Sequence, residues 1–211
     1  MEYKIIYDEE QLRSIKAESV ETLKEGQEIA MELFKVLATQ QTSPALSAAQ
    51  VGLSKRVVVM NIREPLYFVN PEIIDCDKIT PYPESSVNYP SKICFTARYA
   101  RVLVKADNLK NPVWLGLPED SVLNKTTVMH PVVMEAVYLQ QTIESLNGMT
   151  MWDFEVSKNE PTKMEKIKKV YRNELVTIIK DDQELQIKYK RIEQYLEDGW
   201  ILKENKNDEE K

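Results

Sequence analysis

The order of the apolar segments along the chain constrains its fold more than any other feature of the sequence. Residues 19–39 carry apolar side chains at the spacing of an amphipathic helix, and residues 132–146 are predicted to form a second helix with core positions at Val133, Val137 and Ile143. Between these two segments lie short apolar runs that are typical of strands. The strands that we expect there cover residues 56–60, 66–69, 93–95 and 102–105. The chain therefore combines two helices with a strand-rich middle.

The composition changes after Asp153, where a second part of the chain begins. Residues 158–172 are rich in lysine, which indicates a linker or an exposed helix. This predicts two domains, residues 1–155 and residues 156–211. The remaining segments that we expect are a strand at 3–7, a connection at 108–128, a hairpin with strands at 175–179 and 185–189, a short helix at 191–197, a strand at 200–202 and a charged tail at 203–211.

The charge balance argues against a protein that binds nucleic acid. The 211 residues include 28 Lys and Arg against 34 Asp and Glu, which gives a net charge of -6. Proteins that hold a phosphate backbone carry an excess of basic residues instead. No apolar run approaches the ~20 residues of a membrane span, and the first residues show no signal-peptide pattern. We expect a cytoplasmic protein with neither a nucleic-acid nor a membrane partner.

The chain has a single histidine, His130, which precludes a histidine-rich metal site within it. Cys76 and Cys94 are not part of a CxxC pair, so they form no disulfide framework or zinc motif. Cys94 with His130 as its base would be one nucleophilic pair, but nothing in their spacing brings them together. A buried strand cysteine and a histidine that caps a helix are the simpler interpretation.

Three segments resemble, in order, the three sequence motifs of peptide deformylases. Residues 43–52 align with GxGLAAxQxG, residues 84–90 with EGCLSxP, and residues 140–148 with QHExDHLxG. The positions that match are Leu46, Ala48, Gln50, Gly52, Glu84, Pro90, Gln140, Leu146 and Gly148. The resemblance implies the α+β fold of that family for residues 3–155. Residues 156–211 lie outside it, and their own pattern predicts a linker and a small β-hairpin and helix extension.

The same alignment removes the residues that carry the family's chemistry. In peptide deformylases, a cysteine and two histidines hold a divalent metal, whose bound water attacks the formyl group. Those positions are Ser86, Gln141 and Ser145 here, and a neutral amide and two hydroxyls are poor ligands for such a metal. The catalytic glutamate is replaced by Thr142, which cannot accept a proton near neutral pH. We therefore expect a degenerate site with no catalytic residue, no metal and no cofactor.

Gln50 and Val87 are the positions of the degenerate site where binding could persist. In the family, the glutamine side chain and a backbone N–H at the position of Val87 stabilise the oxyanion of the substrate. One interpretation is residual binding of a peptide terminus at Gln50 and Val87. The simpler one is that Gln50 is buried and bonds the neighbouring backbone.

These observations predict a catalytically inactive, deformylase-like protein that serves as a structural or interaction subunit of a larger protein assembly. Its partners would be other protein subunits, and a bacteriophage particle is one such assembly, which would place the protein in a virion. Two alternatives stay open: a module that captures peptide termini in the former cleft, and an active deformylase with an unconventional metal site. The aromatic residues that could anchor a partner are Trp114, Trp152 and Trp200.

Overall fold

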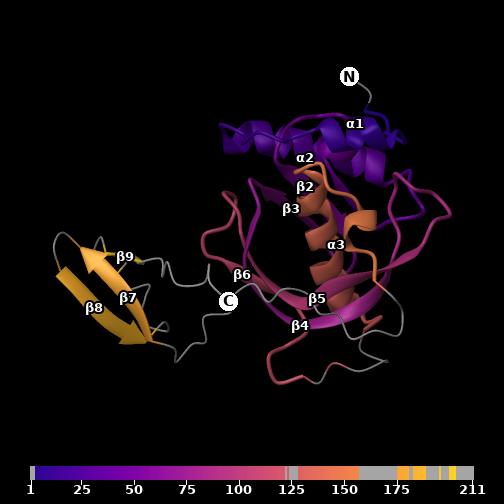
Figure 1. Ribbon diagram of the computed structural model, residues 1–211. Helices are drawn as coiled ribbons and strands as arrows, with labels where there is room; N and C mark the ends of the chain where they lie inside the picture. Colours follow the sequence, from indigo (N-terminus) through magenta and orange to yellow (C-terminus); the bar gives the residue numbers. More distant parts are fainter. Residues whose placement is uncertain are drawn as a thin grey trace. The chain divides into compact units, whose positions relative to one another are not determined.

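The computed structural model describes most of the chain, namely residues 3–121, 123, 128–156, 175–180, 183–188, 195 and 200–202. The chain divides into two units, Met1–Thr162 and Lys163–Lys211 (Figure 1). None of the helices in the described part of the chain is long and apolar enough to cross a membrane.

The first unit contains the helices α1 (Glu9–Ser14), α2 (Leu23–Leu37) and α3 (Pro131–Ser145). Both predicted helices are confirmed, and their caps fix where they begin. The hydroxyl of Thr22 accepts a hydrogen bond from the backbone N–H of Glu25, so α2 begins at Leu23 rather than at residue 19. The sequence pattern does not predict α1, because this helix of six residues buries only Leu12.

The first sheet has a helix packed on each face. Its antiparallel strands, in spatial order, are β1 (Ala45–Ser47), β2 (Val57–Asn61) and β3 (Pro65–Val69). Successive side chains of a strand point to opposite faces. Val57 and Val59 therefore pack in the cluster of α2, while Val58 and Met60 pack in the cluster of α3. This arrangement explains why four consecutive residues of β2 are buried.

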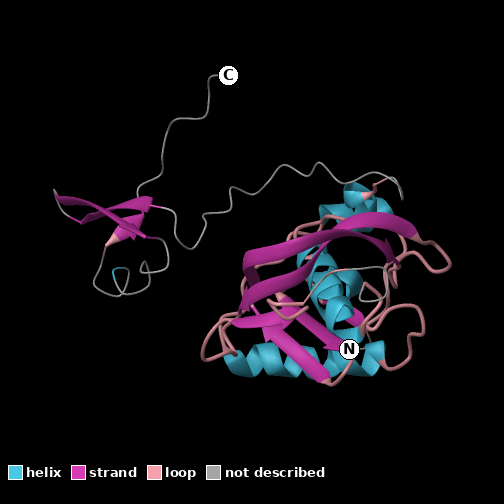
Figure 2. Ribbon diagram, turned by 90° about the horizontal axis from the view of Figure 1, so that it is seen from below, coloured by secondary structure: helices cyan, strands magenta, loops and turns pink. Residues whose placement is uncertain are grey.

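Helix α3 lies at the centre of the unit, between strand layers (Figure 2). Its residues from Glu135 to Ile143 are all buried, polar side chains included. A helix that is buried all round cannot follow an amphipathic pattern, so its polar residues need internal hydrogen-bond partners. Glu135, for example, is fully buried, and its carboxylate accepts hydrogen bonds from Nε and Nη2 of Arg63 at 2.8 and 2.7 Å.

The second sheet of this unit curves around α3 (Figure 1) and has the strand order β4 (Glu72–Glu84), β5 (Cys94–Lys105) and β6 (Val113–Gly116). The strands predicted at 93–95 and 102–105 are parts of the single strand β5. The sequence does not predict β4, since Pro81, Pro83 and several charged residues interrupt any apolar alternation. β4 tolerates both prolines because it is an edge strand, with one side free of the ladder.

The strand predicted at residues 3–7 is wrong, although the segment runs beside the first sheet. The backbone N–H of Ile6 donates to the carbonyl of Gln50 at 3.0 Å, but Gln50 lies in a short helix and not in a strand. The carbonyl of Ile6 accepts from the side chain of Asn88 at 2.7 Å. A side chain takes the place of the second strand, so no continuous ladder forms.

The second unit contains a sheet with the strand order β8 (Gln183–Lys188), β7 (Leu175–Lys180) and β9 (Ile201–Leu202). The predicted hairpin is confirmed, since β7 and β8 pair antiparallel, and β9 confirms the predicted final strand. Ile178 and Ile187 form its buried core with Tyr195 and Trp200. The helix predicted at 191–197, apart from Tyr195, and the segments at 158–172 and 203–211 lie outside the described residues.

Candidate functional site

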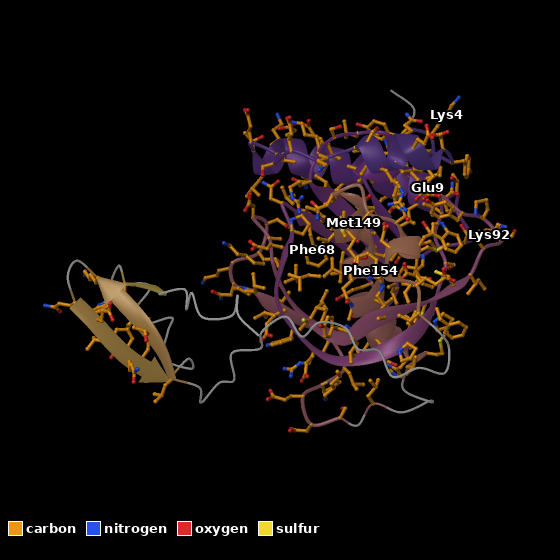
Figure 3. The ribbon with its side chains drawn as sticks, in the orientation of Figure 1. Lys4, Glu9, Phe68, Lys92, Met149 and Phe154 are labelled. Atoms are coloured by element: carbon orange, nitrogen blue, oxygen red, sulfur yellow. The ribbon has the colours of Figure 1, made fainter. Side chains whose placement is uncertain are left out.

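Four of the six residues that the motifs single out lie around one small cavity of ≈ 20 Å³. Gln50 comes from the short helix η1 (Ala49–Val51), Ser86 from the loop after β4, and Gln141 and Ser145 from α3. Met149, which follows α3, also lines the cavity (Figure 3). Figure 3 labels Phe154 as well, the last residue of the short helix η2 (Met151–Phe154). The two remaining residues, Val87 and Thr142, are buried nearby in the chain but do not line the cavity.

The geometry of α3 and its end places two of these side chains together. Gln141 and Ser145 are four residues apart, so they lie one above the other on the same face of the helix. The helix is followed by Gly148, which has a φ of 75°. A Cβ atom there would lie 2.5 Å from the backbone oxygen of Arg13, so only glycine permits α1 to approach this end of α3.

The side-chain amide of Gln141 makes hydrogen bonds through its nitrogen but not through its oxygen. Its Nε2 donates to Oε1 of Glu84 at 2.7 Å and to the backbone oxygen of Ser85 at 2.8 Å. Its Oε1 is buried and lacks a hydrogen-bond partner among the described residues. The side chain therefore ties α3 to the end of β4 and leaves one acceptor unsatisfied.

The hydroxyls of Ser145 and Thr142 are both used within the fold. Ser145 Oγ lies 2.6 Å from Ser47 Oγ and donates to the backbone oxygen of Thr142 at 2.7 Å. The hydroxyl of Thr142 donates back along its own helix, to the carbonyls of Tyr138 and Leu139 at 2.8 and 3.0 Å. Thr142 is fully buried and points its proton at backbone, so it has no access to a reacting molecule.

Gln50 and Ser86 meet at Asn88, a residue that the sequence analysis missed. Gln50 Nε2 donates to Asn88 Oδ1 at 2.6 Å and to Ser86 Oγ at 3.3 Å, while its Oε1 accepts from the backbone N–H of Ser47 at 2.8 Å. Asn88 stands in the second motif, two positions after Ser86, where the family has a serine. That departure from the motif, beside a residue that replaces a ligand, was the only signal in the sequence.

Comparison with known proteins decides the family. The sequence model described as polypeptide deformylase matches residues 3–161, about three quarters of the chain. The chain belongs to the peptide deformylase family. Its relatives include peptide deformylase 2 of Vibrio parahaemolyticus, which is 26% identical over 160 residues, covering 74% of this chain and 87% of that protein. The peptide deformylase of Neisseria gonorrhoeae is 32% identical over 109 residues, covering 49% of this chain and 64% of that protein.

Solved peptide deformylases confirm the predicted α+β fold. The crystal structure of the enzyme from Thermotoga maritima aligns with a TM-score of 0.60 at 21% identity, and covers 74% of this chain and all but 1% of its own. The structure from Legionella pneumophila aligns with a TM-score of 0.55 at 27% identity, covering 74% and 87% of the two chains. The match of the family ends at residue 161, so the second unit lies beyond the part that peptide deformylases share with this chain.

The residues that the motif alignment assigns to the metal positions of peptide deformylases do not fit a divalent transition metal. Ser86, Gln141 and Ser145 offer neutral oxygens, whereas such a metal prefers thiolate and imidazole ligands. The polar atoms of all three already make internal hydrogen bonds, Oε1 of Gln141 excepted. Within the described ranges, no group of three or more His, Cys, Asp or Glu residues is arranged to hold a metal ion.

Two acidic residues of the peptide deformylase motifs, Glu84 and Glu144, share one buried arginine. The guanidinium of Arg98 contacts Glu84 through Nε and Nη2, and Glu144 through Nη1 at 2.6 and 2.7 Å. The ring of Phe154 lies against the same guanidinium, whose central carbon is 4.6 Å from the centre of the ring. Burial raises the pKa of Glu144 to about 7, while Arg98 acts to lower it. Both carboxylates therefore belong to an internal ion cluster with Arg98.

The alternative pair of Cys94 and His130 gains no support from the structure. Cys94 is buried at the start of β5, and burial raises the pKa of its thiol to about 11, which disfavours the nucleophilic thiolate. His130 is exposed and caps α3, where its Nδ1 accepts a hydrogen bond from the backbone N–H of Val132 at 3.3 Å. The histidine therefore has a structural role at the start of the helix.

Proposed function

We propose that this chain is a catalytically inactive peptide deformylase that acts through contacts with other proteins, as a subunit of an assembly. The observation that carries the proposal is the state of the three former ligand positions. Ser86, Gln141 and Ser145 are neutral, and their hydrogen bonds are directed inward to the protein. These hydrogen bonds hold η1, the end of β4 and α3 together. The three side chains therefore do not act as ligands for an ion.

Among the described residues that line the cavity, none has a carboxylate or imidazole that could transfer the proton of a hydrolase. A general base needs a pKa near the working pH and a proton acceptor that faces the reaction. Thr142 fails on both counts, because a hydroxyl does not titrate in this range and its proton is donated to the backbone. Without a metal to lower its pKa, water stays a poor nucleophile at neutral pH.

An assay of deformylation tests the loss of activity directly. The full chain is incubated with a formylated peptide and with zinc, iron(II), nickel or cobalt in turn. We expect turnover equal to that of a control without protein. Turnover above that control with any of the four metals would overturn the proposal and favour an active deformylase with an unconventional metal site.

Trp114 is the best candidate for an anchor in a protein contact. Its side chain is 40% exposed on β6, beside the exposed Val113, and its ring stacks on the guanidinium of Arg101 at 4.0 Å. Trp152 and Trp200 are less exposed, since each packs edge to face on a tyrosine of its own unit. Exposed tryptophan and arginine side chains are over-represented among residues that dominate binding energy.

The size of the native protein tests the assembly. Tagged protein from its own cell is purified and its mass in solution is measured, with co-purifying chains identified. We expect a stable complex with itself or with other chains. A monomer without a co-purifying protein would contradict the proposal. The relatives named above are peptide deformylases of bacteria, so the proposal covers a protein assembly of any kind, not a bacteriophage particle alone.

A second candidate function, capture of a peptide terminus, rests on the position of Gln50 beside Ser86 at the cavity. Both amide protons of Gln50 are already donated, to Asn88 and Ser86, and a peptide would have to displace one of them. Substituting Gln50→Leu while measuring binding of a formylated peptide tests this candidate. Equal binding by the two folded proteins would exclude it.

A further inference from the structure

The cavity at the former metal site contains an acceptor that the protein itself does not satisfy. Oε1 of Gln141 is buried, and the residue is only 4% exposed. The amide cannot be turned over to solve this, because both partners of its Nε2, the carboxylate of Glu84 and the carbonyl of Ser85, are acceptors. The hydrogen-bond network therefore fixes the orientation of this amide, whose side chain lines the cavity.

A second unsatisfied polar atom belongs to the same cavity. The hydroxyl oxygen of Tyr89, a part-buried residue, is the other buried side-chain atom that makes no hydrogen bond of ordinary geometry in the described part of the chain. Burial raises the pKa of this hydroxyl, while the nearby side chain of Thr150 acts to lower it. Tyr89 lines the cavity together with Gln141 and the hydroxyl residues Ser86 and Ser145. An unsatisfied buried polar group costs about 1–3 kcal/mol in proteins, so two such groups on residues that line one cavity indicate a missing partner.

The volume of the cavity selects the kind of partner. About one probe sphere, on the order of 10–15 Å³, is enough for a water molecule, and the cavity has ≈ 20 Å³. A water can donate to Gln141 Oε1 and accept from the hydroxyl of Tyr89, whereas an apolar molecule can do neither. A hard cation would need six or more oxygen ligands, but the oxygens of Ser86 and Asn88 already accept hydrogen bonds here.

We infer that one internal water molecule is bound in this cavity, between Gln141 and Tyr89, at the place where relatives of this chain hold their metal. This inference rests on the proposed function, since it requires that no metal ion occupies the site. The water has a structural role: it completes the hydrogen bonds of a polar core that Gln141 would otherwise leave open.

Oxygen-17 magnetic relaxation dispersion counts the long-lived internal waters of a protein in solution and tests the inference on the full chain. The variant Gln141→Met keeps the length of the side chain but removes the acceptor. We expect it to lose one long-lived water relative to the parent chain. The matched control is Gln27→Met on the exposed face of α2, which should lose none.

The variant Tyr89→Phe covers the case in which Gln141→Met does not fold. It keeps the ring that packs on Trp152 and removes one partner of the water. We expect a smaller amplitude of its dispersion, because a water that has lost one hydrogen-bond partner is less ordered in the site. An unchanged dispersion in the folded variants would overturn the inference and leave the proposed function standing. A stoichiometric transition metal in the purified parent chain, found by elemental analysis, would overturn both.

Discussion

The amide of Gln141, which the motif alignment places at a metal-binding histidine, donates a hydrogen bond to the carboxylate of Glu84 over 2.7 Å. The same carboxylate is held by Arg98 and by the hydroxyl of Thr96. Hydrogen bonds to an ionised group are stronger than those between neutral groups. The former ligand position therefore contributes to a buried polar cluster that stabilises the fold.

Substituting Gln141→Leu should destabilise the protein. The change removes two donors, so Glu84 and the carbonyl of Ser85 each lose a hydrogen bond. We expect the free energy of unfolding in urea to fall by about 1–3 kcal/mol. The control Gln27→Leu, on the exposed face of α2, should change it by less than about 0.5 kcal/mol. Equal midpoints for the two variants would contradict the structural role of Gln141.

Substituting Arg98→Met should have a larger effect. Arg98 is 1% exposed and is the cation that the structure places between Glu84 and Glu144. Removing it leaves the buried carboxylate of Glu84 and the partly buried carboxylate of Glu144 without their counter-charge, which costs about 3–5 kcal/mol. Arg101→Met is the matched control on the same strand, since Arg101 pairs with the exposed Glu119. The two variants are compared by thermal and urea unfolding, and comparable losses would count against the cluster.

The stability of the protein should depend on pH through Glu144. Burial raises the pKa of Glu144 from its ordinary value of 4.5 to about 7 in the folded protein. Between these values the folded protein holds a proton that the unfolded chain releases, so this group makes the free energy of unfolding fall as the pH rises from about 4.5 to about 7. The variant Glu144→Gln cannot titrate, so it should gain stability relative to the parent chain over this window. Parallel curves of unfolding free energy against pH would refute this assignment.

Restoring the family's ligands should restore metal binding. The triple variant Ser86→Cys, Gln141→His and Ser145→His places one thiolate and two imidazoles where the motifs align. We expect one cobalt(II) per chain, with the absorption band of a cobalt–thiolate bond, and a rise in the midpoint of thermal unfolding on adding zinc. The parent chain should show neither. The double variant without Ser86→Cys is the control that should lack the thiolate band, and a triple variant that folds but binds no metal would mean that the motif alignment is incorrect.

Substituting Trp114→Ala should weaken association without unfolding the protein. Trp114 is 40% exposed and its ring stacks on the guanidinium of Arg101, so little core packing is lost. We expect binding of the co-purifying partner to weaken by about 2 kcal/mol or more, as at binding hot spots. Tyr7→Ala, which removes another exposed aromatic side chain, serves as the control. Undiminished binding by Trp114→Ala would show that the interface lies elsewhere.

The sequence by itself determined the elements whose residues follow a local pattern. The helices at α2 and α3, the strand Val57–Asn61 and the hairpin of β7 and β8 all show the spacing of their own secondary structure, and the order of the three motifs is sufficient to identify the family. The same alignment predicted which positions carry Ser86, Gln141 and Ser145. These predictions need no knowledge of distant contacts, because helical and strand periodicity record which face of a segment is buried.

The tertiary structure decided what depends on partners far away in the chain. β4 is a strand because it pairs with β5 from Glu72 to Glu84, despite two prolines, while residues 3–7 are not a strand because the side chain of Asn88 takes a ladder position. The inward hydrogen bonds of Gln141 and the small cavity beside it likewise arise from groups on three separate elements. Hydrogen bonds and ion pairs between distant segments have no local period, so only the assembled fold shows whether a polar side chain is a site or part of the core.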